Sequence, residues 1–268
     1  DPEGLDVAFR STDLTTGAER VWNDSIFREP DGRWAHVYWS TFQAEHEHRY
    51  RLLAEGPEAQ TASAAVTVPG AATLEVLEPD TVRNRPISTP RRWAEVPLRV
   101  NGEVPRLIKV RADYCLQYPT AQNELLSQIF TLDYNGSQEK VPGGWAFRIK
   151  LHEDLNTFLP IIPQSREFPR VRIHGVRIRL HVVDEGWDPP DLDNDFDPND
   201  IVQPGTMTNV EGGFGFIGAG FRLSTWLDVD SDVYEKAGFE AVGSCPIAGK
   251  TDETISAFRD GTEKPDDP

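Results

Sequence analysis

Oxygen ligands for a cation are concentrated between residues 184 and 200, the most acidic stretch of the chain. Calcium takes roughly six to eight oxygen ligands, and carboxylates at alternate positions are a common source of them. An EF-hand loop is excluded, because its sixth position would be Phe196 and its twelfth Val202. The pattern predicts either a calcium site of another type or a solvated acidic loop turned by prolines. The candidate calcium ligands are Asp191, Asp193, Asp195 and Asp197.

A second candidate metal site is the run Glu45-His46-Glu47-His48. On a strand, His46 and His48 share one face, which is a spacing that zinc or copper can use. A third ligand is needed, and His36 is the nearest candidate in the sequence. The alternative is a polar turn that leads into a strand at Tyr50.

Acidic pairs also raise the question of acid–base catalysis. Asp184 with Glu185, and Glu153 with Asp154, are pairs of the kind that glycosidases use. Acidic pairs are frequent in so acidic a chain, and the sequence contains no nucleophile elbow, zinc-protease helix or Walker loop. We therefore expect a non-enzymatic protein without a cofactor, calcium excepted, and keep a metal-assisted hydrolase as an alternative.

Aromatic side chains offer a binding function. Trp34 and Tyr38 lie on one face of a predicted strand over residues 33–42, and with Trp22 they would form a platform on which sugar rings stack. Aromatics at alternate positions are also typical of a sandwich core. A carbohydrate-binding module is thus one alternative function, and a calcium-stabilised adhesin is another.

Two cysteines, Cys115 and Cys245, are far apart in the sequence and lack the spacing of a zinc or redox motif. In an oxidising compartment they would close one disulfide around a long stretch of chain. Otherwise Cys115, which has apolar and aromatic neighbours, is a buried thiol.

The elements that must position these residues are strands, because apolar residues alternate along most of the chain. Short strands over 5–10, 33–42, 48–54 and 63–68 predict a first sandwich of the immunoglobulin or transthyretin kind in residues 1–70. A second β-rich domain is predicted for residues 71–250. The class is all-β, and residues 251–268 are expected to form a mobile polar tail.

Within the second domain, strands are predicted over 98–100, 107–118, 145–151, 171–183 and 221–229. Gly175 accompanies a shift of one residue in the alternation of the longest strand, which indicates a bulge. Short helices are expected over 123–130 and 232–237.

Charge excludes several partners. A net charge of −17 repels phosphate backbones and anionic membrane surfaces, so nucleic-acid binding is not expected. Excess carboxylate with little lysine is also typical of salt-adapted proteins.

No apolar run reaches the ~18 residues that a membrane-spanning helix needs. The sequence begins at Asp1 without a leader, and we expect that an export leader was removed.

Two passages resemble a known family. The first is a strand pair that runs from Tyr50 to Pro57 and closes at Val66-Thr67-Val68-Pro69. The second, from Thr208 to Ala219, carries Asn209, Gly212, Gly213 and Gly215 around buried aromatics. This glycine motif lacks the lysine and following helix of a phosphate loop, so we interpret it as a packing motif.

The chain resembles an uncharacterised family of secreted lipoproteins of Bacteroidota-type bacteria, often encoded beside TonB-dependent outer-membrane receptors. The resemblance covers about residues 5–225. It implies export to the periplasm or outer-membrane surface, a protein partner such as a TonB-dependent receptor, and a lipid anchor at a cysteine that this chain does not contain. It implies no catalytic residues. We therefore expect a cell-envelope accessory or binding protein.

Overall fold

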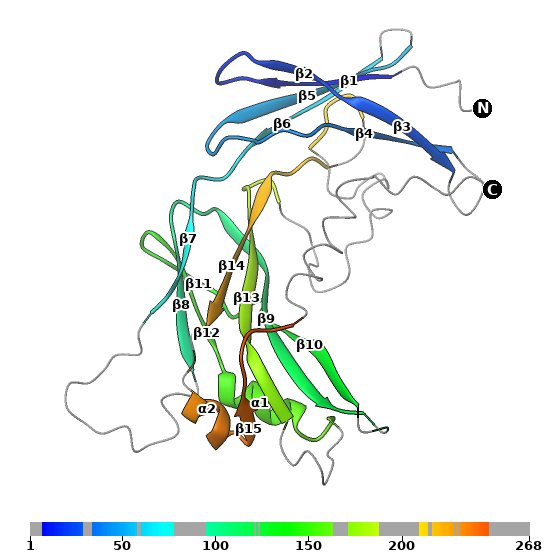
Figure 1. Ribbon diagram of the computed structural model, residues 1–268. Helices are drawn as coiled ribbons and strands as arrows, with labels where there is room; N and C mark the ends of the chain where they lie inside the picture. Colours follow the sequence, from blue (N-terminus) through cyan, green and yellow to red (C-terminus); the bar gives the residue numbers. More distant parts are fainter. Residues whose placement is uncertain are drawn as a thin grey trace.

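Fifteen strands and two short helices make up the described part of the chain in the computed structural model (Figure 1), which confirms the all-β class. The structure describes residues 7–28, 34–57, 60–77, 95–120, 122, 124–162, 171–187, 209–213, 216–227, 229 and 231–246. Nearly all strand pairs are antiparallel, and they form several sheets.

The predicted first domain contains a four-stranded sheet, sheet A, and a two-stranded ribbon. Sheet A has the order β2-β1-β5-β6. Its strands are β1 (Ala8–Asp13), β2 (Glu19–Val21), β5 (Arg49–Glu55) and β6 (Thr61–Thr67). The ribbon consists of β3 (Asn23–Arg28) and β4 (Trp34–Trp39). β1 begins three residues later than predicted, and its outermost partner β2 was not predicted.

The predicted second domain contains a sandwich of two sheets around one core. Sheet C has the order β11-β12-β8-β7, from β7 (Thr73–Val76), β8 (Val96–Asn101), β11 (Glu139–Val141) and β12 (Gly144–Ile149). Sheet D has the order β10-β9-β13-β14, from β9 (Arg106–Pro119), β10 (Leu125–Asp133), β13 (Val171–Val183) and β14 (Gly220–Leu227). β15 (Phe239–Ala241) adds to β13 in parallel.

The main hydrophobic core lies between sheets C and D. Leu98 and Ile149 of sheet C meet Leu116, Ile178 and other side chains of sheet D, and all four are completely buried. Each such side chain contributes about 1.5–3 kcal/mol through burial. Because only one face of sheet D enters this core, alternate residues of its strands are left on the opposite face.

Two helices close one end of this sandwich (Figure 1): α1 (Leu151–Phe158) and α2 (Ser231–Lys236). α2 confirms the helix predicted over 232–237. The helix predicted over 123–130 is wrong, because those residues lead into β10, which pairs with β9 from Leu125 to Asp133. The strand predicted to reach residue 151 ends at Ile149, where the chain turns into α1.

A bulge at Gly175 confirms the prediction for β13. The register with β9 shifts between Ile173 and Gly175, and Gly175 has a φ of +147°, which favours glycine. The bulge keeps Ile173 and then Val176 in the core. Every second residue beyond it, starting at Arg177, therefore points away from the core.

Asp154 anchors α1 to sheet D. Its carboxylate accepts hydrogen bonds from the hydroxyls of Tyr114 and Tyr134, and Tyr134 also accepts one from the backbone N–H of Lys150 at 2.9 Å. Burial, together with the neighbouring Asp154, raises the pKa of both tyrosines, so both hydroxyls stay protonated and can donate. Burial raises the pKa of Asp154 as well.

Asp154→Ala is expected to lower the free energy of unfolding by about 2–3 kcal/mol, because it leaves two tyrosine hydroxyls without their acceptor. Glu153→Ala is the matched control. Glu153 is exposed and pairs only with Lys150 at 3.1 Å, so its loss should cost less than about 0.5 kcal/mol. Urea denaturation of both variants measures the difference, and equal midpoints would contradict the anchoring role.

Candidate functional site

The outer face of sheet D, which points away from the core, carries the densest group of basic side chains in the described strands. Strand pairing places Arg111 beside Arg179, Asp113 beside Arg177, and His181 beside Arg222. Lys109 joins them at a position of β9 with a φ of +51°. We call this set the basic face: Lys109, Arg111, Asp113, Arg177, Arg179, His181, Arg222, Ser224 and Trp226.

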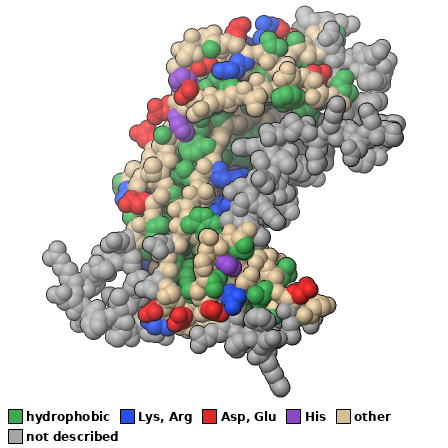
Figure 2. Space-filling view, viewed as in Figure 1, with side chains coloured by type: hydrophobic (Ala, Val, Ile, Leu, Met, Phe, Trp, Pro, Cys, Tyr) green, Lys and Arg blue, Asp and Glu red, His purple; other side chains and the backbone are tan. Residues whose placement is uncertain are grey.

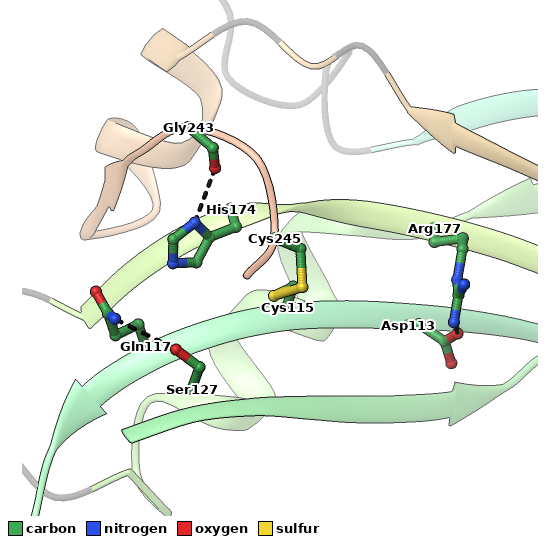
Figure 3. Close-up of a disulfide and its surroundings, with 8 residues drawn as sticks. All are labelled: Asp113, Cys115, Gln117, Ser127, His174, Arg177, Gly243 and Cys245. Atoms are coloured by element: carbon green, nitrogen blue, oxygen red, sulfur yellow. Dashed lines mark hydrogen bonds and ion pairs between the residues drawn. A yellow bond between two sulfur atoms is a disulfide. The ribbon is translucent and has the colours of Figure 1, made fainter. Parts of the chain in front are cut away.

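Asp113 organises the centre of the basic face. Its carboxylate is 1% exposed and accepts hydrogen bonds from both Nε and Nη2 of Arg179. Arg177, which is 4% exposed, reaches the same carboxylate at 3.3 Å (Figure 3). The Thr131 hydroxyl donates to it at 2.8 Å. One carboxylate thus holds two guanidinium groups in place.

His181 lies among the cations of the basic face. Burial, followed by the positive charges of Arg222, Lys109, Arg111 and Arg179, lowers its pKa to about 4. The imidazole is therefore neutral at pH 7. The positive charge of the face at neutral pH comes from lysine and arginine alone.

Stability should depend on pH through His181. Its folded pKa of about 4 lies below the ordinary value of 6.5, so between pH 6.5 and 4 the unfolded chain takes up a proton that the folded chain does not. The free energy of unfolding should fall as the pH falls through this window, by about 2 kcal/mol after allowance for partial exposure. His181→Gln should have a flatter profile. Urea midpoints at pH 7.5 and 5 test this, and an unchanged slope in the variant would contradict it.

An exposed aromatic side chain completes the basic face. Trp226 is 42% exposed, and Arg177 lies over its ring, 5.7 Å from the ring centre to the guanidinium carbon. A Cβ at Gly175 would stand 3.4 Å from the indole, which is ordinary van der Waals contact, so the ring of Trp226 packs next to Gly175 of β13. Arg222, Ser224 and Trp226 alternate along β14 and are all exposed.

The disulfide Cys115–Cys245 crosses the same face (Figure 3). It joins β9 to the segment after β15, with the two Cα atoms 6.0 Å apart, and Cys115 is 1% exposed. His174 of β13 holds the same segment through Nδ1 and the Gly243 carbonyl, 2.8 Å apart. The sequence left open a bridge or a buried thiol, and the structure contains the bridge.

The predicted sugar platform divides between described and undescribed side chains. Tyr38 stacks on Phe9, with ring centres 5.4 Å apart, and Phe9 meets Trp22 edge-on at 5.0 Å. These three half-buried rings pack against one another. The side chain of Trp34 lies outside the described residues, so its sugar contact stays a prediction.

The two histidines of the Glu45–His48 run have separate partners. His46 Nδ1 lies 2.9 Å from the Pro69 carbonyl, and His48 Nδ1 lies 2.9 Å from Asp13. Burial alone would raise the pKa of Asp13, but hydrogen bonds from Thr16, His48 and Thr15 outweigh it and lower the pKa to about 2. Among the described residues, no three metal-binding side chains come together.

Other acidic candidates fall into two groups. Asp191, Asp193, Asp195 and Asp197 lie outside the described residues, so the calcium site stays a prediction. The acid pairs do not act as pairs: Asp154 is buried beside an exposed Glu153, and Asp184 binds the backbone N–H groups of Gly186 and Ala219 beside an exposed Glu185.

The glycine motif docks the second half of the chain on the first domain. Asn209 exchanges two hydrogen bonds with the backbone of Ile217, at 2.7 and 2.9 Å. Glu211 pairs with Ser63 of β6, and Gly212 has a φ of +76° against the backbone of Thr61. A Cβ at Gly213 would press on Ala62 at 3.1 Å, while Gly215 lies outside the described residues.

This docking crosses the predicted domain boundary at residue 70. Ile217 and Ala219 pack against Tyr50, Val66 and Val68, which are the buried core residues of the first domain. A segment that the sequence assigned to residues 71–250 therefore contributes to the first domain. The polar tail over 251–268 lies outside the described residues.

Sequence reasoning missed the basic face, although a signal for it exists. In β13 the outward positions Arg172, His174, Arg177, Arg179 and His181 are all arginine or histidine. Acidic side chains, by contrast, reach the surface of both domains in Figure 2, as a net charge of −17 requires. The basic face was not predicted because the sequence as a whole is strongly acidic.

Comparison with known protein families, with curated proteins and with solved structures finds no match to this chain. No helix among the described residues is long and apolar enough to cross a membrane.

Proposed function

We propose that this chain is a non-enzymatic binding protein of a bacterial cell envelope, exported to the periplasm or the outer-membrane surface. It acts there as an accessory to a protein partner, an outer-membrane receptor of the TonB-dependent kind. The basic face of sheet D is its ligand-binding surface. Membrane attachment through a lipid-bearing cysteine belongs to the family resemblance, because neither cysteine of this chain is available for it.

The disulfide is the observation that carries this proposal. Disulfides form and persist in oxidising compartments and are rare in the cytosol. Cys115 is buried and bridged to a residue 130 positions away, so the bond belongs to the folded architecture of the second domain. This supports export, as does the resemblance to a family of secreted lipoproteins.

A binding role is favoured over catalysis by what the buried carboxylates do. Asp113 holds two arginines, Asp154 holds two tyrosines, and Asp184 holds backbone N–H groups. Each of these carboxylates joins segments that are distant in the sequence. Among the described residues, no group of three His, Cys, Asp or Glu side chains comes together that could hold a metal ion.

Export is tested by fractionating cells that produce the protein from its full reading frame and alkylating free thiols before lysis. The protein should appear in the envelope fraction with both cysteines resistant to alkylation. Reduction before alkylation should label both. Recovery from the cytoplasm with reactive cysteines would overturn the proposal.

The receptor partnership is tested with a TonB-dependent receptor, such as one encoded beside the gene if the gene has such a neighbour. Both proteins are produced together in an outer membrane, and the tagged chain is captured after mild detergent extraction. The paired receptor should be retained, while an unrelated receptor produced at the same level should not. Equal retention of both receptors would remove the partnership.

A further inference from the structure

We propose that the chain associates with a second copy of itself through β10, whose open edge pairs with the same edge of the other copy, antiparallel and centred on Ile129. This pairing joins the two D sheets into one continuous sheet across a twofold axis. The inference concerns an interface that the proposed function does not use, so it can fail while export and receptor capture stand.

β10 is the outermost strand on one side of sheet D (Figure 1). It pairs with β9 along its whole length, and no described segment pairs with it on the side away from β9. At nine residues it is the longest outermost strand of the described sheets, since β14 has eight residues and the others three to seven. We call its side away from β9 the β10 edge. A strand edge of this kind presents unpaired N–H and C=O groups to which another strand can bind.

Two hydrogen bonds at the ends of β10 show which backbone groups face this edge. The N–H of Thr120 donates to the carbonyl of Glu124, and the N–H of Tyr134 donates to the carbonyl of Val110, both at 2.7 Å. Opposite residues of an antiparallel pair alternate between hydrogen-bonded and non-hydrogen-bonded positions, so the even-numbered residues of β10 bond to β9. The residues whose N–H and C=O point to the β10 edge are therefore Leu125, Ser127, Ile129, Thr131 and Asp133.

β10 lacks the features that usually protect a strand edge from another chain, which are proline, lysine, bulges and inward charges. Its sequence contains neither proline nor lysine, and its register with β9 continues without a shift. Its one charged residue, Asp133, stands at the end of the strand and lies 3.6 Å from Arg111. Leu125 and Leu126 are 39% and 44% exposed. The edge is therefore suited to a partner strand.

The residues of β10 match a second β10 strand. With Ile129 opposite Ile129 of the second copy, all nine residues overlap, and Ser127 lies opposite Thr131 of the second copy. Leu126 then lies opposite Leu132 of the second copy, at a non-hydrogen-bonded position where opposite side chains come closest. The twofold axis repeats each of these contacts. Pairing in this register covers the exposed side chains of Leu125 and Leu126.

Charge favours the same register. Each Asp133 lies opposite Leu125 of the second copy, so the two Asp133 carboxylates stand at opposite ends of the joint, roughly 27 Å apart along the strand. Their repulsion is screened at that distance, which is about three Debye lengths at physiological salt. Length, apolar pairs and charge thus all match when β10 meets itself, and a second copy is the partner that we assign to this edge.

The test is sedimentation velocity of the purified chain from low to high micromolar concentration, at low and at high salt. We expect a change from monomer to dimer as the concentration rises. The dimer should be stronger at high salt, because screening reduces the repulsion between two copies that each carry a net charge of −17. A chain that stays monomeric over the whole range would overturn the inference.

Proline variants locate the interface. Ser127→Pro removes an N–H that points to the β10 edge, so β10 can still pair with β9, and the dissociation constant of the dimer should rise about tenfold or more. Val21→Pro on β2 is the matched control. The N–H of Trp22 donates to the carbonyl of Phe9 at 3.0 Å, so the N–H of Val21 points away from sheet A in the same way. This control should change the dissociation constant less than about twofold, and equal effects of the two variants would contradict the β10 interface.

Amide exchange of the unmodified chain tests the joint without any substitution. A higher protein concentration should slow exchange at Ser127, Ile129 and Thr131, whose N–H groups point to the β10 edge. Gln128 and Phe130 should change much less, because their N–H groups already donate to β9. Slowing that is confined to another strand would place the dimer elsewhere and overturn the inference. If Ser127→Pro abolishes receptor capture and the unmodified chain is monomeric, the β10 edge is the receptor's docking site and the second copy is wrong.

Discussion

Removing the disulfide is expected to lower the free energy of unfolding of the second domain by about 4 kcal/mol. Cys115 and Cys245 enclose a loop of 130 residues, and the restriction that such a closure places on the unfolded chain is worth about 3–5 kcal/mol. For a domain of this size the loss corresponds to a melting temperature lower by about 10 °C. Calorimetry of the chain with and without dithiothreitol measures it.

A Cys115→Ala/Cys245→Ala double variant provides the control. Its melting temperature should match that of the reduced protein and should not respond to dithiothreitol. β15 pairs with β13 over three residues, and the bond together with His174 holds the segment that follows. Amide exchange over 239–246 should therefore rise more in the variant than exchange in β9. A melting temperature that is unaffected by reduction would show that the bridge contributes nothing to stability.

The strands that could be predicted from the sequence are those in which apolar residues alternate with other residues, so that the pattern alone shows which side chains are buried. β13 was predicted with its bounds and its bulge, because valine, isoleucine and leucine occupy every inward position and Gly175 marks the phase shift. β9 was predicted from the alternation of Val110, Ala112 and Tyr114, which all enter the core. In both strands the local pattern and the tertiary environment agree, so the pattern was sufficient.

The elements that were mispredicted depend on partners far away in the sequence. Residues 125–133 have neither strict alternation nor strong strand propensity at Leu125, Leu126 and Gln128, and their pairing with β9 decides the outcome. α1 follows β12 directly, and its place is set by the contacts of Asp154 with Tyr114 and Tyr134. Neither contact has a signal within a short window of sequence.

The candidate site was missed because a functional face is a two-dimensional arrangement. Arg111, Arg179 and Arg222 come from three strands, and each one looks like an ordinary outward residue. The predicted metal sites, by contrast, were short runs in the sequence: the aspartates of 191–197 and the histidines of 46–48. In the part of the chain that the structure describes, the residues brought together are those with distant positions in the sequence.

Asp113→Ala is expected to destabilise the protein by about 3–5 kcal/mol. The substitution leaves Arg177, whose side chain is 5% exposed, without the carboxylate that compensates its buried charge, and it removes both hydrogen bonds of Arg179. Asp133→Ala is the matched control on the neighbouring strand. Its carboxylate is 48% exposed and lies 3.6 Å from Arg111, so its loss should cost less than about 1 kcal/mol.

A double variant separates the cost of the unpaired charge from the cost of lost packing. Asp113→Ala combined with Arg177→Met removes the buried cation as well as its partner, and should recover part of the lost stability, because an apolar side chain of similar length suits the buried position beside Trp226. Urea denaturation of the single and double variants gives the coupling energy. If Asp113→Ala costs no more than Asp133→Ala, the buried carboxylate does not organise the basic face.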